Sequence, residues 1–319
     1  MFENRLKKLK KEKEKWAKRN TILAYRVYDE DIPQVPVILD RYNDRFVLYD
    51  KSSLRFQTEE EKEERFKVIA SIVIQVFNIP AESLYLKTRK KQKGHDQYEK
   101  LDSISKEFEV NENHVKLLIN LSDYIDTGLF LDHRITRRWF GETSSGKHVL
   151  NLFCYTGAFT VYAAVGGAAS VTSVDMSKTY IEWAKRNLAI NGKSGRNFEY
   201  LTTDVLQWIR DEAKNPDRKR YDLIFLDPPT FSNSKKMTEE WNVEDNHRNL
   251  ILTLLTKFLT PTGEIWFSTN FRKFVWAIPD EEWKERGYLC LDLSLESIPE
   301  DFRDKKIHRL YKIMPTNAQ

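Results

Sequence analysis

The sequence predicts an α/β fold built on a largely parallel sheet and preceded by a smaller α+β domain. Residues 148–177 run from a short apolar segment through a turn and a helical segment to a second β-branched run, which is the pattern of a βαβ unit. Three successive predicted strands end on an acid, at Asp175, Asp204 and Asp227. Residues 21–122, in contrast, mix hairpin and helix signals without regular alternation.

Composition describes an ordinary globular chain. It has 319 residues, 40% of them hydrophobic, and a formal net charge of +4, and this length suggests two domains. The two cysteines, Cys154 and Cys290, have no paired spacing, which argues against a disulfide framework and a zinc site, so we expect no metal. No stretch approaches the roughly 18 continuous apolar residues of a membrane span, and the charged N-terminus does not resemble a signal peptide. We therefore expect a cytoplasmic protein without a membrane partner.

Residues 1–20 are strongly basic, and Leu6, Leu9 and Trp16 lie at helical spacing. This segment is predicted to be a basic helix or a linker. It could neutralise RNA phosphates, or it could be a solvated leader or a linker to a missing upstream domain.

Residues 21–122 predict a small accessory domain, with a hairpin over 25–50 and a helix that starts at a capping box of Thr58 and Glu61. A basic loop follows at 87–98. Its lysines suit RNA phosphates and its tyrosine could stack on an unpaired base, although a solvated surface loop explains the same charges. The candidate RNA-binding residues of this domain are Lys87, Arg89, Lys90, Lys91, Lys93 and Tyr98.

Residues 123–319 are expected to form the second domain. Within 124–139, His133 is expected to be a structural histidine, because no second histidine lies at metal-binding spacing nearby. In the βαβ unit, Gly157 would let the backbone pass close to a ligand and Asp175 could accept hydrogen bonds from both ribose hydroxyls. The turn lacks the glycines of a dinucleotide site and the lysine of a triphosphate site, so S-adenosylmethionine (SAM) fits better than NAD or ATP. The alternative is that Gly157 only turns the chain and Asp175 caps the next helix.

The later strands carry the most specific pattern. Asp204 could accept from an adenine amino group or cap the following helix. The apolar strand 223–226 ends at Asp227, and Pro228 and Pro229 then stiffen the backbone so that carbonyls and Phe231 face a planar ring. This pattern is typical of base-methylating enzymes, and its alternative is a plain Asp-Pro turn. The polar loop that follows places Lys235 and Lys236 to meet substrate, and two last strands, 288–295 and 309–313, should pair antiparallel.

A family resemblance rests on five motifs: FCYTGAFTV, VDMS, DPPTFSNSKKM, TGLFLDHR and KTRKKQKGHDQYEKL. Together they resemble the RlmK-type guanine-N7 methyltransferases of 23S ribosomal RNA, which in many bacteria form the C-terminal half of a fused RlmKL protein. The resemblance implies a class I methyltransferase fold, Rossmann-like, with a seven-stranded sheet whose last strand is antiparallel. It also implies SAM as methyl donor and 23S RNA or a precursor of the large ribosomal subunit as partner.

The resemblance further implies a set of cofactor-site residues. By motif these are Asp132, Arg134, Asn151, Phe153, Tyr155, Thr156, Gly157, Asp175, Met176, Asp204 and Asp227. Fused relatives carry an upstream guanine-N2 methyltransferase half, so whether this chain stands alone or is a fragment stays open.

The expected reaction is direct methyl transfer to guanine N7. This atom has a lone pair and no proton to lose, so positioning is required and a general base is not. Covalent methylation of cytosine C5 is disfavoured, because no cysteine follows strands four and five. The predicted catalytic residues are Asp227, Pro228, Pro229 and Phe231. Two alternatives stay open: methylation of an exocyclic amine, on guanine N2 or adenine N6, and a non-catalytic protein of ribosomal RNA binding or ribosome assembly.

Overall fold

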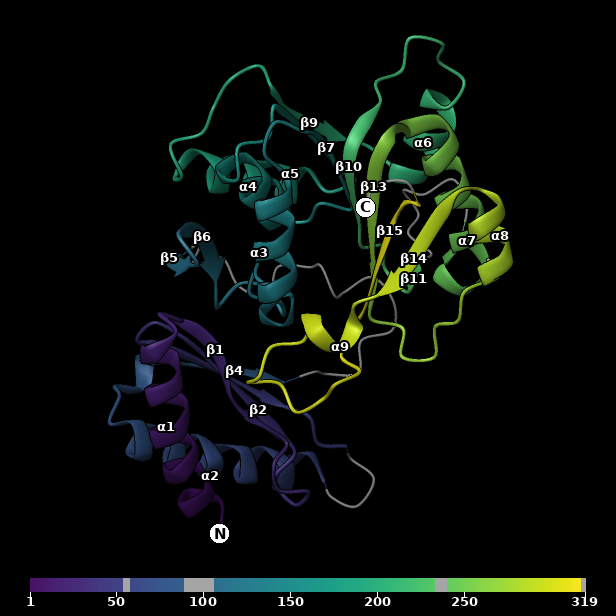
Figure 1. The fold of residues 1–319 in the computed structure, drawn as a ribbon. Helices are drawn as coiled ribbons and strands as arrows, with labels where there is room; N and C mark the ends of the chain where they lie inside the picture. The colour runs from purple at the N-terminus through teal and green to yellow at the C-terminus, as the bar shows by residue number, and fades with distance from the viewer. Residues whose placement is uncertain (54–57, 89–105, 233–239, 317–319) are drawn as a thin grey trace. The chain divides into compact units, whose positions relative to one another are not determined.

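The computed structural model describes residues 1–53, 58–88, 106–232 and 240–316. The chain forms two compact units (Figure 1). The first comprises residues 1–131 together with 300–304, and the second comprises residues 132–299 together with 305–319. Each unit is described by itself.

The first unit is a four-stranded sheet covered by two helices. The sheet has the order β1 (Ala24–Asp29), β2 (Val37–Tyr42), β3 (Arg45–Asp50) and β4 (Leu84–Thr88), and only the β3–β4 pair is parallel. A separate hairpin joins β5 (Glu107–Glu112) to β6 (Val115–Asn120), and a short 3-10 turn, η2 (Ala81–Ser83), precedes β4.

Helix α2 (Glu59–Phe77) begins at the predicted capping box: the Thr58 hydroxyl accepts from the Glu61 N–H, and the Glu61 carboxylate accepts from the Thr58 N–H. The basic N-terminal segment forms helix α1 (Phe2–Arg19), with Phe2, Leu6 and Leu9 buried in the same core as α2. This segment is thus a packed helix of the first unit.

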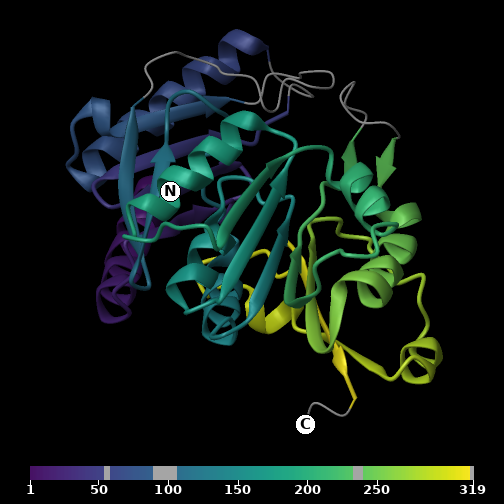
Figure 2. The same ribbon diagram turned by 90° about the horizontal axis from the view of Figure 1, so that it is seen from above.

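The second unit is built on a seven-stranded sheet of order β14-β15-β13-β10-β7-β8-β9. The five strands from β13 to β9 are parallel, as Figure 2 shows from above, and β15 runs antiparallel to both β13 and β14. The predicted seven-stranded sheet with an antiparallel last strand is confirmed. The strands are β7 (His148–Leu152), β8 (Ser170–Asp175), β9 (Phe198–Thr202), β10 (Tyr221–Leu226), β13 (Leu259–Thr269), β14 (Tyr288–Asp292) and β15 (Arg309–Pro315).

Helices cover both faces of this sheet because its central strands are apolar on both faces. Along β10, Leu223 and Phe225 join one hydrophobic cluster, whereas Ile224 and Leu226 join the other. The helical elements are η4 (Leu131–His133), α3 (Arg134–Thr143), α4 (Ala158–Val165), α5 (Lys178–Ala189), α6 (Val205–Glu212), α7 (Val243–Thr253), α8 (Asp280–Glu285) and α9 (Ser294–Ser297). A short hairpin pairs β11 (Phe231–Ser232) with β12 (Trp241–Asn242).

One local prediction differs from the structure. The helix expected from about Glu244 to Leu259 is α-helical only to Thr253 and continues as a π-helical turn, η5 (Leu254–Phe258). The expected turn at 261–263 lies within β13, where the pairing register with β10 shifts. The extra residues between Leu259 and Glu264 are absorbed as a bulge.

Candidate active site

The carboxyl ends of the parallel strands bring most of the candidate residues together. Leu152 at the end of β7 pairs with Val174 of β8 and with Leu226 of β10, and Leu226 pairs with Phe267 of β13. The segments that follow these paired residues, 153–157, 175–177, 227–231 and 268–273, therefore start from one edge of the sheet. Open α/β sheets bind their ligands at this edge.

The segment after β7 has an unusual backbone. Phe153, Tyr155 and Gly157 all have positive φ values, of 55°, 51° and 74°. A left-handed conformation in a bulky residue costs on the order of 1–3 kcal/mol and persists only where the surroundings impose it. Here the Tyr155 N–H donates to Asp175 Oδ2 at 2.9 Å and Asn187 Nδ2 donates to the Thr156 carbonyl at 2.8 Å. The loop is thus held in one strained shape.

Gly157 is required by packing as well as by φ. A Cβ at this position would lie 2.5 Å from Ala184 Cβ and 3.0 Å from Ala184 Cα, both on helix α5. From the sequence, we expected a glycine here so that a ligand could approach the backbone closely. The structure gives a second reason for a glycine, which is the close contact between the loop and α5.

Asp175 ends β8 and holds the backbone on both sides. Its carboxylate accepts from the Tyr155 N–H at 2.9 Å and from the Ser177 N–H at 2.8 Å. Burial raises the pKa of this carboxyl, and hydrogen bonds from the backbone of Ser177, Tyr155 and Met176 oppose the rise. A carboxylate offers about four acceptor positions, so these three backbone donors leave about one position for a ribose hydroxyl. These residues fit a nucleoside such as SAM, and the ribose contact remains a prediction.

Two other candidates have structural contacts. Asn151 is buried, and its Nδ2 donates to Thr160 Oγ1 at 2.9 Å, while Thr160 bonds to Ser173 at 2.7 Å. Asn151 thus ties β7 to α4 from within the core. Asp204 is the N-cap of α6, where its carboxylate accepts from the Leu206 N–H at 3.0 Å, so the capping alternative is realised and the adenine contact remains a prediction.

The Asp-Pro-Pro segment follows β10. Asp227 has 31% of its side-chain surface exposed, and burial raises its pKa to about 6. A hydrogen bond with Ser268 and the charge of His308 oppose that rise, whereas the negative charge of Asp132 adds to it. Phe231 is 55% exposed, as a ring that stacks on an incoming base would be.

Two backbone carbonyls of this segment, which were expected to face a planar substrate ring, accept hydrogen bonds from within the protein. The indole N–H of Trp241 donates to the Pro229 carbonyl at 2.6 Å, and the Val243 N–H donates to the Thr230 carbonyl at 3.0 Å. Trp241 is 2% exposed, and its ring also packs at a tilt on Phe153, with 6.4 Å between centroids. This tryptophan joins the Asp-Pro-Pro segment to the strained loop. No motif in the sequence pointed to it.

A histidine pair lies behind Asp227. The rings of His133 and His308 stack at 4.3 Å with 12° between their planes, and Asp132 Oδ2 lies 2.9 Å from His308 Nδ1. Sequence reasoning missed His308 because it lies far along the chain from His133. Asp132, His133 and His308 offer ligand atoms within 4.8 Å of one another. A shared ion is disfavoured, because imidazole binds metals in its ring plane and these planes are nearly parallel. Arg134, the other carried-over residue of this segment, is buried on α3.

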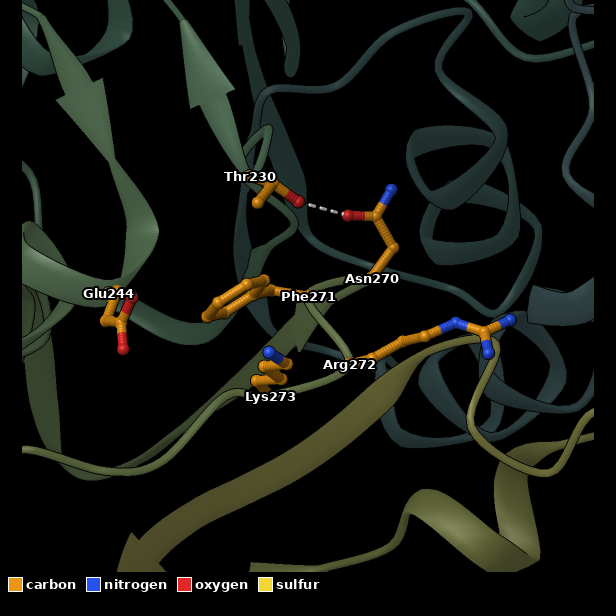
Figure 3. Close-up of a pocket in the computed structure, with 6 residues that line it drawn as sticks. All are labelled: Thr230, Glu244, Asn270, Phe271, Arg272 and Lys273. Carbon is orange, nitrogen blue, oxygen red and sulfur yellow. Dashed lines mark hydrogen bonds between the residues drawn. The ribbon is translucent and has the colours of Figure 1, made fainter. Parts of the chain in front are cut away.

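A hollow of about 700 Å³ opens beside this edge (Figure 3). Figure 3 shows the Thr230 hydroxyl bonded to Asn270 Oδ1, which directs the amide nitrogen of Asn270 away from Thr230. The lining residues are Thr230, Glu244, Asn270, Phe271, Arg272 and Lys273. Two cations and one acid thus line a space that adjoins the Asp-Pro-Pro segment.

Among the candidate RNA-binding residues, the structure describes only Lys87. Its side chain is buried, and its ammonium donates to the Tyr124 carbonyl and, at 3.0 Å, to the Ile125 carbonyl. Burial lowers its pKa to about 8. Contrary to the expectation, Lys87 is a buried structural lysine. Arg89, Lys90, Lys91, Lys93, Tyr98, Lys235 and Lys236 lie outside the described residues.

The cysteines are both protonated at neutral pH. Burial raises the pKa of Cys154 well above its usual value and that of Cys290 to about 12. Since the thiolate is the nucleophilic form, neither cysteine is suited to covalent catalysis. This agrees with the argument against cytosine C5 chemistry.

Comparison with known proteins finds methyltransferases, both as the matching family model and as similar sequences. Residues 72–283 match a family model described as S-adenosylmethionine-dependent methyltransferase. A Neisseria meningitidis protein named ribosomal RNA large subunit methyltransferase K is 45% identical over 312 residues, which cover 98% of this chain and 86% of the relative. A Vibrio parahaemolyticus protein named ribosomal RNA large subunit methyltransferase K/L is 46% identical over 98% of this chain but only 43% of the relative. The chain thus spans less than half the length of the K/L relatives.

The fold also has solved counterparts. A crystal structure of a methyltransferase complexed with SAH superposes with a TM-score of 0.74 at 23% identity, covering 98% of this chain and 81% of that chain. At this identity the likeness concerns the fold alone. Among the helices of the described ranges, none combines the length and hydropathy that a membrane crossing requires.

Proposed function

The chain belongs to the S-adenosylmethionine-dependent methyltransferase family, and we propose that it methylates N7 of a guanine in 23S ribosomal RNA. The observation that carries this proposal is the 45% identity to the Neisseria ribosomal RNA methyltransferase K, over 98% of this chain and 86% of the relative. The proposed partner is 23S RNA or a precursor of the large ribosomal subunit, and the proposed location is therefore the cytoplasm. This chain matches only 43% of the length of the Vibrio K/L relative, so the proposed activity corresponds to that part of the longer protein.

We propose a separate role for each of the three segments predicted from the sequence. Residues 123–319 would carry catalysis, residues 21–122 would be an accessory RNA-binding domain, and residues 1–20 would add basic charge. The basic net charge of +4 is modest, so the position of the cations matters more than their number.

Cofactor binding in this proposal rests on the strained loop and the tip of β8. When bound, SAM supplies a methyl group on an electrophilic sulfonium. Asp175 would hold the ribose hydroxyls, and Asp132, Arg134, Phe153, Tyr155, Thr156, Gly157, Met176 and Asp204 would surround the rest. The preformed backbone of the loop means that little ordering is left to occur on binding.

Substrate binding rests on the Asp-Pro-Pro segment and the neighbouring hollow. Asp227 would accept from the N1–H or amino edge of the guanine, Phe231 would stack on its face, and the prolines would keep both groups in place. Arg272 and Lys273 would neutralise phosphates of the strand that enters the hollow. Taking the base out of a helix costs a few kcal/mol, and an unpaired guanine avoids this cost.

Methylation of guanine N7 requires alignment of the two reactants and no general base. The N7 lone pair would form the new bond to the methyl carbon as the bond from that carbon to the sulfonium sulfur breaks and S-adenosylhomocysteine leaves. No proton would be lost, so the residues of the site would need only to position the two reactants. The neutral thiols of Cys154 and Cys290 leave no nucleophile for the covalent route.

A second candidate is methylation of an exocyclic amine, on guanine N2 or adenine N6. The observation that favours it is the raised pKa of Asp227, about 6, because a carboxylate titrating near neutral pH can accept the proton that an amine loses.

Nucleoside mass spectrometry of 23S RNA separates the candidates. RNA from a strain that lacks this protein is compared with RNA from the same strain carrying the gene on a plasmid. Loss of 7-methylguanosine, restored by the plasmid, is the expected result. Loss of an N2-methylguanosine or N6-methyladenosine mark would favour the second candidate, and no loss of any mark would point to a non-catalytic RNA-binding or assembly role.

A further inference from the structure

A chain of buried polar groups in the second unit leads to Asp227. Ser297 Oγ on α9 lies 2.9 Å from His308 Nε2, and His308 Nδ1 lies 2.9 Å from Asp132 Oδ2. Ser297 and His308 are 0% and 1% exposed. His308 stacks on His133, whose Nε2 lies 3.4 Å from Ser268 Oγ and 3.8 Å from Asp227 Oδ2. None of the functional roles above uses Ser297 or His308.

The hydrogen-bond directions let His308 carry a proton. Asp132 accepts, so His308 Nδ1 donates to it. Ser297 Oγ has two possible acceptors for its single hydrogen, His308 Nε2 and the Ser294 carbonyl at 2.9 Å. When Ser297 donates to Ser294, Nε2 must donate and the ring is an imidazolium. When Ser297 donates to Nε2, the ring is neutral. Rotation of one hydroxyl therefore lets His308 gain or lose a proton while both contacts persist.

His308 is the better placed of the two rings to carry a proton, because its Nδ1 lies 2.9 Å from Asp132 Oδ2, whereas His133 Nε2 lies 3.9 Å from the same oxygen. Burial, together with the neighbouring charges of His308 and Arg137, lowers the pKa of His133 to about 3, and the charge of Asp132 opposes this shift. Two stacked imidazolium rings would repel each other, so only one carries charge. Around this pair the charged or titratable groups are Asp132 on η4, Arg137 on α3 and Asp227 after β10.

We propose that His308 is a positioning residue whose protonated ring, held by Asp132 and Ser297, keeps Asp227 an ionised hydrogen-bond acceptor beside neutral His133. Two carboxylates, Asp132 and Asp227, lie 3.9 Å and 3.8 Å from the same nitrogen of His133. Left alone they would favour protonation of one of them, since like charges at short distance resist double ionisation. The cation on His308 offsets Asp132, and Asp227 stays free to accept from the base. This inference rests on the proposed function only in naming that base.

The direction of the pH effect follows from the charges. Asp227 must be ionised to accept, so the rate falls as the pH drops through its pKa of about 6. Removing the cation at position 308 raises this pKa, and the acidic limb of the pH profile moves to higher pH. A residue with only a structural role would lower the rate by the same factor at every pH.

The first test compares His308→Asn with His133→Asn. In His308→Asn the introduced amide can still donate to Asp132 but carries no charge, so the acidic limb of methylation at saturating RNA and SAM should rise by roughly half a pH unit or more. His133→Asn removes a neutral ring and should lower the rate without moving the limb. Both variants must match the wild type in circular dichroism and in SAM affinity by calorimetry. Equal loss of rate at all pH values in His308→Asn would overturn the proposal.

A second measurement needs neither activity nor a variant that folds poorly. In wild-type protein labelled with ¹³C-carboxyl aspartate, the Asp227 signal, assigned with Asp227→Asn, should shift when the His308 ring titrates. An Asp227 signal that ignores the titration of His308 would sink the inference. Failure of the proposed function would instead appear as wild-type protein that methylates no ribosomal RNA while these titrations stay coupled.

Discussion

Asp175 and Asp227 are both carboxylates at strand ends, yet their surroundings prepare them for different partners. Asp175 receives backbone N–H groups from Tyr155 and Ser177, so its oxygens are fixed in place. Asp227 shares its neighbourhood with Asp132 and a histidine pair, so its charge is sensitive to groups nearby. The first arrangement suits hydroxyl groups of an uncharged ribose, and the second suits the N–H edge of a base.

The role of Asp175 is tested by replacing it. Asp175→Ala should weaken SAM binding about 10- to 100-fold, since hydrogen bonds to a charged acceptor contribute roughly 1.5–3 kcal/mol. Calorimetry measures the affinity directly. Asp175→Asn is the matched control, because its amide oxygen can still accept from the loop backbone and should restore part of the affinity. Unchanged binding in the alanine variant would refute the ribose assignment.

The hollow beside the Asp-Pro-Pro segment makes a separate prediction. The double variant Arg272→Gln, Lys273→Gln should raise the KM for RNA and flatten the salt dependence of RNA binding, by about 0.7 in log–log slope per lost phosphate contact on a single strand. SAM affinity should not change. Lys284→Gln removes an exposed cation from α8 and serves as control. An unaltered salt slope in the double variant would remove the hollow from the RNA path.

At the scale of elements, the close fit between the strained loop and α5 fixes the cofactor edge. Gly157→Ala places a methyl group 2.5 Å from Ala184 Cβ and at a positive φ, so it should lower the free energy of unfolding by about 1–3 kcal/mol. Adding Ala184→Gly should restore the free energy of unfolding that is lost through the clash with Ala184 Cβ, but not the free energy that is lost through the positive φ of residue 157. Urea unfolding of the four proteins of this cycle measures both parts. Additive effects would show that the two residues do not interact.

Elements with local signals were predictable, and contacts between distant elements were not. The capping box before α2 and the acid at the end of β8 follow from neighbouring residues, so their positions could be predicted. The pairing of His133 with His308, the bond from Trp241 to Pro229 and the burial of Lys87 depend on segments far apart in the chain. A lysine near the end of a strand, as Lys87 is in β4, looks the same in sequence whether its ammonium contacts solvent or two carbonyls.

At the scale of the whole molecule, the chain does not divide at one point. Residues 300–304 belong to the first unit, where Asp301 accepts from the Arg26 N–H at 2.8 Å and the Arg303 N–H donates to Asp29 at 2.9 Å. The Arg26 guanidinium also lies 4.2 Å from the centroid of the Phe302 ring. The sequence gives no signal that residues 300–304 belong to the first unit, because a short charged segment near the end of a chain has the composition of an ordinary loop.

We propose that this chain by itself binds SAM and methylates guanine N7 in 23S RNA. The most direct measurement incubates the purified chain with SAM and an unmodified 23S transcript, or the RNA of a strain lacking the protein, and analyses the nucleosides by mass spectrometry. We expect 7-methylguanosine at one position, and we expect Asp227→Ala to reduce its amount strongly. Methylation on an exocyclic amine instead, or no methylation of either RNA by protein that binds SAM, would contradict it.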